Sequence, residues 1–251
     1  MEDICYDNVN TLYSRLHANP GHITTPNWPI TVREDLFHYT GALFATFLDE
    51  YYNPTLCQPL IEMRTLFGNH SGSHTRADID SILRMNYNSS FQKAVGHYAI
   101  WRYFMDSLDD GRHFIEGADY DTTVPVRTWS TYPASGTEGT LDPNGPGGCN
   151  YNRLLSYGSS NDLTIYFNGE NGYEWAVYLL AYNGSTSYEY KMVLDAAQDT
   201  GTIIIPGSVF PTKVVMIPVA VQWNPLCTTL AYTFTASTSP GVIGVSEPRS
   251  G

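Results

Sequence analysis

Basic residues are scarce in this chain of 251 residues, which has 13 Lys and Arg against 25 Asp and Glu and a formal net charge of −12. Nucleic acids and anionic membrane surfaces are bound through clustered Lys and Arg, so the composition argues against both as partners. Long hydrophobic runs are also missing, since no apolar stretch approaches the roughly 20 residues of a membrane span. We therefore expect neither a nucleic-acid partner nor a membrane span.

A secretory signal is not recognisable at the start of the chain. Met1-Glu-Asp-Ile-Cys is acidic where the first part of a signal peptide would be basic. Yet 19 Tyr, 21 Gly and 15 Pro, with only 15% charged residues, are typical of a secreted, turn-rich protein. We expect an extracellular protein, and we interpret this chain as a fragment or processed product of a longer one.

Cysteines are few, and they lack the CxxC spacing of zinc sites. Two lie in each half of the chain: Cys5, Cys57, Cys149 and Cys227. Their even number in an extracellular context favours two disulfides, with Cys5–Cys57 and Cys149–Cys227 as the economical connectivity among three alternatives. Four buried thiols are the other interpretation.

Catalytic motifs are absent. The sequence contains neither the HExxH of zinc peptidases nor the GxSxG of serine hydrolases. His70 and His74 have the spacing of one helical turn, but glycine and serine lie between them at a helix break, so we interpret them as loop residues. We predict no catalytic residue.

The first half of the chain has helical periodicity. Apolar residues recur every three to four positions over residues 36–48, and further helices are expected from Thr55, from Thr75 and from Ser90 to about Met105. Residues 1–121 are therefore predicted to form an all-helical subdomain.

After residue 121 the pattern changes to the alternation of strands. Six runs of β-branched and aromatic residues are separated by turn signals, at 162–167, 173–180, 187–194, 201–205, 213–217 and 230–235. Asn168-Gly169 and Asn183-Gly184 are the best hairpin candidates, whereas residues 130–148 are expected to form a long loop. The predicted fold class is α+β: the helical subdomain, an antiparallel β-sandwich over 122–237 that is Ig-like or jelly-roll-like, and a flexible tail over 238–251.

Residues 101–120, called the acidic segment below, carry the densest group of carboxylates. Oxygen donors around a glycine suit Ca²⁺, so the candidate calcium ligands are Asp106, Asp109, Asp110 and Glu116. The register does not fit an EF-hand. Helix caps and surface solvation are the alternative, with Arg102 and Arg112 neutralising the carboxylates.

Three stretches resemble the region downstream of the catalytic motif in myxobacterial-type secreted zinc metallopeptidases. The N-terminal Met1-Glu-Asp resembles a family segment WMED, residues 38–50 resemble a helix of the form YGSxLFxxFLSE, and residues 101–120 resemble the signature WNxFTGxRDDGRHYEEG. Arg102 replaces the usual Asn of that signature. The resemblance implies that the HExxH helix and its zinc belong to a longer parent protein, with no cofactor in this chain besides the candidate calcium.

Two functions follow from these observations. The first is the non-catalytic C-terminal portion of a secreted metallopeptidase-like protein, whose β-sandwich contacts a substrate, another protein or a cell surface. The second is an extracellular structural or adhesive subunit that self-assembles on a degenerate peptidase scaffold.

Overall fold

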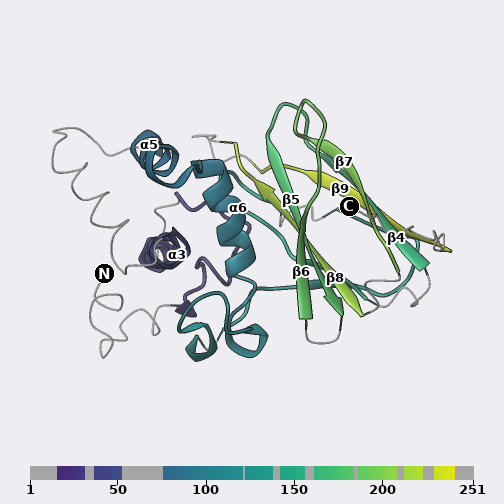
Figure 1. Ribbon diagram of the computed structural model, residues 1–251, viewed down its shortest axis with the longest axis horizontal. Helices are drawn as coiled ribbons and strands as arrows, with labels where there is room; N and C mark the ends of the chain where they lie inside the picture. Colours follow the sequence, from purple (N-terminus) through teal and green to yellow (C-terminus); the bar gives the residue numbers. More distant parts are fainter. Residues whose placement is uncertain are drawn as a thin grey trace, which may run out of the picture.

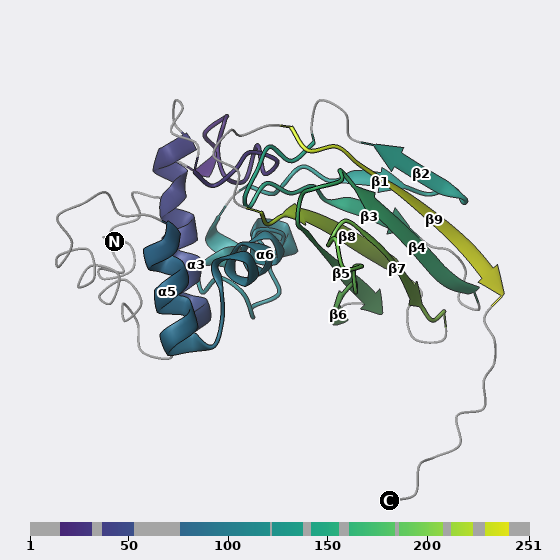
Figure 2. The same cartoon turned by 90° about the horizontal axis from the view of Figure 1, so that it is seen from above.

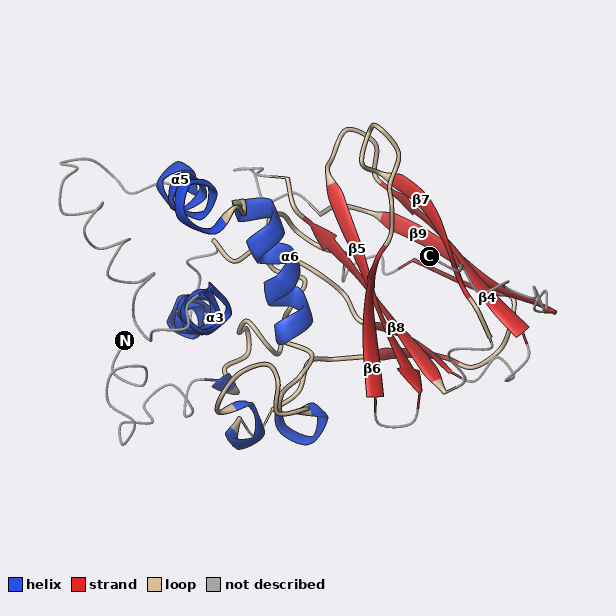
Figure 3. Ribbon diagram, in the orientation of Figure 1, coloured by secondary structure: helices blue, strands red, loops and turns tan. Residues whose placement is uncertain are grey.

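The computed structural model describes residues 16–31, 37–52, 76–120, 122–137, 142–155, 161–183, 186–207, 212–222 and 229–240. These contain three α-helices and two mostly antiparallel sheets, so the protein is α+β with a β-rich body (Figures 1 and 3). The helix expected from Thr55, together with His70 and His74, lies outside the described residues.

In the described ranges, three α-helices and three short 3₁₀ helices precede the strands. They are η1 (Phe37–Gly41), α3 (Ala42–Tyr52), α5 (Arg76–Tyr87), α6 (Phe91–Trp101), η2 (Asp106–Leu108) and η3 (Gly117–Asp119). As expected, α6 begins after Ser90, whose side-chain oxygen accepts a hydrogen bond from the Lys93 N–H at 3.2 Å.

The end of α6 was predicted four residues too late. The helix stops at Trp101, and the next three backbone N–H groups donate to the carbonyls of Tyr98, Ile100 and Trp101 in a tightening turn. Tyr103, Phe104 and Met105 are all at most 1% exposed. These three consecutive side chains are packed in the core by the turns that follow the helix.

The residues that the structure describes contain nine strands, which form the two sheets. They are β1 (Arg127–Trp129), β2 (Ala134–Thr137), β3 (Asn152–Leu155), β4 (Asn161–Gly169), β5 (Trp175–Asn183), β6 (Thr186–Lys191), β7 (Thr200–Ile205), β8 (Lys213–Ala220) and β9 (Tyr232–Pro240). One sheet has the order β1-β3-β8-β5-β6 and the other β2-β9-β4-β7. Only β1 and β3 run parallel among the strand pairs described.

Some strands differ from the prediction. β2 lies inside the stretch expected to be a loop, and it is held by antiparallel pairing with β9 from Ala134↔Ala236 to Thr137↔Thr233. β3 was not predicted, and β9 continues to Pro240, so it includes the first residues of the expected tail. Short strands of this kind depend on their partner rather than on their own composition.

The two hairpin candidates have opposite outcomes. β5 and β6 pair across Asn183↔Thr186, which confirms the second. The first is wrong, because β4 and β5 belong to different sheets. Gly169 lies against the indole of Trp175, where an added Cβ would be 2.7 Å or closer to three indole atoms. The chain therefore crosses from one sheet to the other at this position.

The five-stranded sheet is the middle layer of the protein. Figure 2 shows the helices on one side of it and the four-stranded sheet on the other. Alternate residues of β5 belong to two apolar clusters: Tyr178 and Leu180 face the helices, whereas Val177 and Leu179 face the second sheet. Eight of the nine β5 residues are consequently buried, which explains why its sequence is continuously apolar.

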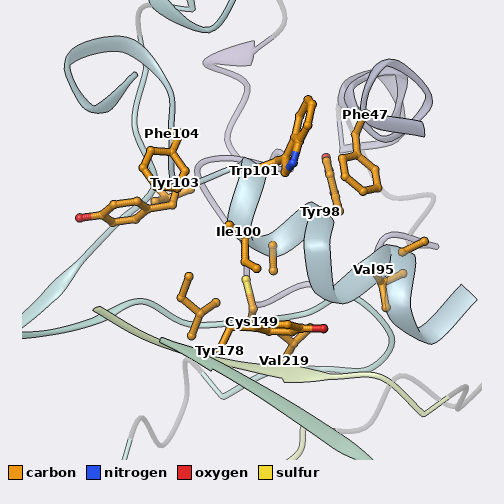
Figure 4. Packing of buried hydrophobic residues seen from close by; sticks show 14 of the residues in the cluster. Phe47, Val95, Tyr98, Ile100, Trp101, Tyr103, Phe104, Cys149, Tyr178 and Val219 are labelled. Carbon is orange, nitrogen blue, oxygen red and sulfur yellow. The ribbon is translucent and has the colours of Figure 1, made fainter. Parts of the chain in front are cut away.

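Helix α6 packs directly on this sheet. Figure 4 shows Val95 and Ile100 directed toward Cys149, Tyr178 and Val219, while Phe47 of α3 lies on the opposite side of the helix. These side chains belong to one apolar cluster and all are at most 1% exposed. The helical part and the sheet therefore share a core.

Candidate functional site

The acidic segment folds back on itself after α6. Phe104, Phe114 and Tyr120 are each 1% exposed and hold it against the core, whereas its carboxylates are partly or fully exposed. Gly111 has φ +66°, a left-handed conformation that glycine adopts without strain. The aromatic residues therefore fix the backbone, and the polar residues remain available.

Asp110 is the best-satisfied of the four predicted calcium ligands. One oxygen accepts hydrogen bonds from Arg112 Nη2 at 2.7 Å and Nε at 3.1 Å, and the other lies 2.7 Å from His113 Nδ1. These partners lower the pKa of Asp110 although burial opposes the charged form. The expected neutralisation by Arg112 is thus present at Asp110.

The other three carboxylates do not join Asp110. Asp106 begins η2, Asp109 Oδ1 lies against Gly117, and Glu116 precedes η3. Within the described ranges, no group of three or more His, Cys, Asp or Glu side chains is arranged to hold a metal ion. Calcium binding by the segment stays a prediction.

Arg102 does not neutralise the acidic segment as expected. Its side chain is fully buried and turns toward the core, where Nη1 donates to the His22 carbonyl at 2.8 Å. Nη2 donates to the Gly147 carbonyl at 2.8 Å and to Cys149 Sγ at 3.1 Å. Arg102 therefore joins α6 to two distant loops.

Cys149 is a free, buried thiol in this structure. Burial raises its pKa, although Arg102 and Tyr151 oppose this shift. Its expected disulfide partner, Cys227, lies outside the described residues, as do Cys5 and Cys57.

A cleft of about 550 Å³ opens where the helices, the acidic segment and the sheet meet. Its lining comes from α3, the end of α6, the acidic segment, β5 and β6: Glu50, Tyr51, Trp101, Phe104, Arg112, His113, Ile115, Leu180, Ser187 and Glu189. The acidic segment contributes five of these residues. The acidic segment is therefore brought to a concave surface, although its four predicted calcium ligands are not in the lining.

Stacked rings and hydrogen bonds hold the floor of the cleft. The His113 imidazole lies on the Phe104 ring, with centroids 3.9 Å apart and planes 8° from parallel. Burial lowers the pKa of His113, and the neighbouring Asp110 carboxylate opposes this shift. Arg112 also donates to Ser187 Oγ at 3.0 Å, which ties the acidic segment to β6.

Glu50 and Glu189 are acidic residues of the cleft that were not predicted from the sequence. The backbone N–H of Ile115 donates to Glu50 Oε2 at 2.9 Å. Burial raises the pKa of Glu50 to about 7, with further contributions from Glu116 and Asp49. A signal was available for Glu50, because an acidic residue in the last turn of a helix opposes the helix dipole.

Glu50→Gln is expected to stabilise the protein at alkaline pH. The pKa of Glu50 is about 7 in the folded state, above its usual value of 4.5. Between these two pH values only the folded state retains the proton, so the free energy of unfolding falls as the pH rises from 4.5 to above 7. Glutamine retains an acceptor for the Ile115 N–H. Urea unfolding should show a gain of about 1–2 kcal/mol at pH 8, after discounting for partial exposure, and almost none at pH 4.5. Exposed Glu174→Gln is the matched control, and a loss of stability at pH 8 would contradict the prediction.

No protein family matches the chain at the level of sequence, and no curated protein does so either.

Among the described residues, no helix is both long and apolar enough to cross a membrane.

Two solved structures show weak similarity. The pre-peptidase C-terminal domain of a collagenase from Bacillus anthracis is 8% identical, over 46% of this chain and 95% of that one, with a TM-score of 0.31. PliG of Aeromonas hydrophila, a periplasmic inhibitor of g-type lysozyme, is 9% identical. The match covers 45% of this chain and 97% of PliG, with a TM-score of 0.28. Likeness at this level carries no conclusion about function.

Proposed function

We propose that this chain is the non-catalytic, interacting portion of a secreted metallopeptidase-like protein, and that its cleft holds an extended segment of a protein substrate or surface partner. In this proposal residues 1–121 form the helical subdomain and 122–237 the β-sandwich. The observation that carries it is the cleft, which combines aromatic, apolar and ionisable side chains from both parts of the chain. Such a mixed concave surface is typical of binding sites.

The position of the cleft beside β6 favours a peptide as the ligand. β6 is an edge strand of the five-stranded sheet as described, and its Ser187 and Glu189 line the cleft. An extended peptide can add to a sheet edge through backbone hydrogen bonds while its side chains enter a neighbouring pocket. No bond-breaking group is required for this role.

A panel of fluorescein-labelled decapeptides with basic, neutral and acidic sequences tests the proposal by fluorescence anisotropy. We expect at least one class to bind, and Ile115→Ala to weaken that binding about three- to tenfold, because this 71% exposed side chain forms part of the cleft wall. Val193→Ala is the matched control, since Val193 is 84% exposed and does not line the cleft. Equal effects of the two substitutions would contradict a role for the cleft.

A self-assembling subunit is the second candidate, and one surface favours it. The outer face of the four-stranded sheet carries Tyr166 on β4 and Ile204 on the edge strand β7, which are 42% and 58% exposed. Exposed edge strands with apolar side chains can pair with a second copy. A chain that binds no peptide but sediments as concentration-dependent assemblies would favour this candidate over the first.

A further inference from the structure

Two carboxylates in the cleft have no cationic partner among the described residues. The ion pairs between described residues involve Asp80 and Asp110 instead. Burial raises the pKa of Glu50, as described above, and also that of Glu189. Glu50 is partly buried, so ionising its carboxylate costs free energy unless a cation approaches it, whereas Glu189 is exposed on β6. This arrangement is typical of a site whose cation arrives with a ligand.

The walls beside the carboxylates suit a cation on an apolar stem. Tyr51 is 38% exposed and packs edge-on against Trp101, with ring centroids 5.7 Å apart. Aromatic rings attract cations within about 6 Å of their centroids. Exposed Ile115 offers apolar surface to the methylene groups of a long side chain.

Within the part of the chain that the structure describes, the remaining charges around Glu50 do not supply a free cation. Asp49 and Glu116 add negative charge, and Arg112 already binds Asp110 and Ser187. His113 lies 2.7 Å from Asp110 through Nδ1, so it is already paired with a carboxylate. The positive charge of Lys191, two residues from Glu189 on β6, lies 5.7 Å from the ring centroid of Tyr178. The local balance is therefore negative, as it is for the whole chain.

We propose that the cleft binds the lysine or arginine side chain of an extended peptide, with Glu50 and Glu189 as its carboxylate partners and Tyr51 and Trp101 as its aromatic wall. The inference rests on the proposed function and specifies its ligand. A peptide is favoured over a free amine because the edge of β6 lies beside the cleft and can pair with an extended backbone.

The test uses the full chain and the probe Ac-Ala-Ala-Lys-Ala-Ala-NH₂, measured by isothermal titration calorimetry. The same peptide with norleucine replacing lysine retains the stem and lacks the charge. We expect the lysine peptide to bind at least tenfold more tightly at pH 8. Its affinity should fall about tenfold at pH 6, because a carboxyl group with a pKa of about 7 changes from mostly ionised to mostly protonated over this range.

Glu50→Gln should weaken binding of the lysine peptide at pH 8 and remove most of its pH dependence, while circular dichroism shows the variant to be folded. Glu189→Gln should weaken binding without removing the pH dependence that Glu50 provides. The control Glu174→Gln removes an exposed carboxylate just before β5, six positions from Leu180, and should leave binding unchanged.

Three results would overturn the inference. Equal affinity for the lysine and norleucine peptides would show that the cleft does not recognise a basic side chain. The proposed function would remain, because peptides of other sequences could still bind. Equal affinity for cadaverine and the lysine peptide would show that the cleft binds a small amine and that the peptide backbone does not contribute. Failure of every peptide in both experiments would reject the inference and the proposed function together.

Discussion

Arg102→Lys is expected to lower the free energy of unfolding by about 3–5 kcal/mol. The guanidinium makes three hydrogen bonds, to His22 O, Gly147 O and Cys149 Sγ, and lies 4.6 Å from the Tyr98 ring centroid. A lysine side chain ends in a single ammonium group, which cannot donate to all three acceptors at once as the planar guanidinium does. The substitution therefore leaves buried carbonyl groups without a donor and a buried charge with fewer hydrogen bonds.

Urea unfolding at pH 7 measures this loss, and Arg84→Lys provides the control. Arg84 is an exposed residue of α5 that pairs with Asp80 at 2.6 Å, so its replacement should change stability by less than about 0.5 kcal/mol. A second variant, Arg102→Met, removes the charge as well as the hydrogen bonds. If the free energy of unfolding of Arg102→Lys is within about 1 kcal/mol of that of the unmodified chain, the hydrogen bonds of Arg102 contribute little to stability.

Gly96→Ala is expected to destabilise the protein by about 1–3 kcal/mol, although alanine is the better helix former. Gly96 lies where α6 packs against β5, and an added Cβ would lie 2.5 Å from the Tyr178 hydroxyl oxygen and 2.8 Å from its Cε2. The Tyr178 side chain is 1% exposed, so it cannot move aside without disturbing the core.

The close approach of Gly96 to Tyr178 can be tested by a double-mutant cycle in thermal unfolding. Tyr178→Phe removes the nearest atom, so the loss caused by Gly96→Ala should be smaller in its presence. Lys93→Ala, at an exposed position of the same helix, controls for effects on helix propensity. Strictly additive losses would indicate that the two residues do not collide.

Elements whose signals lie within a few residues were predictable. The Ser90 cap and the apolar run that follows it predicted the start of α6, and Asn183-Gly184 predicted the turn between β5 and β6. The continuous apolar sequence of β5 likewise indicated a strand. Capping, turn conformation and alternation act over one or two turns of chain, so a local pattern is sufficient.

The cleft was only partly predictable. The sequence analysis singled out the acidic segment, which supplies half of the lining, but for calcium ligands rather than for His113 and Ile115. It did not find Glu50 or Glu189, because no local pattern brings the end of α3 beside β6. Their raised pKa values arise from burial by distant elements.

The sequence by itself determined the acidic charge, the change from helices to strands near residue 121, and the positions of most strands, because composition and periodicity are local properties. Only the tertiary structure decided that β5 buries both of its faces, that Arg102 turns into the core, and that Glu50 meets the acidic segment. Arg102 and His22 are 80 positions apart, and Ile115 and Glu50 are 65 apart. Contacts at such separations depend on how all the layers pack together, and no short stretch of sequence encodes that.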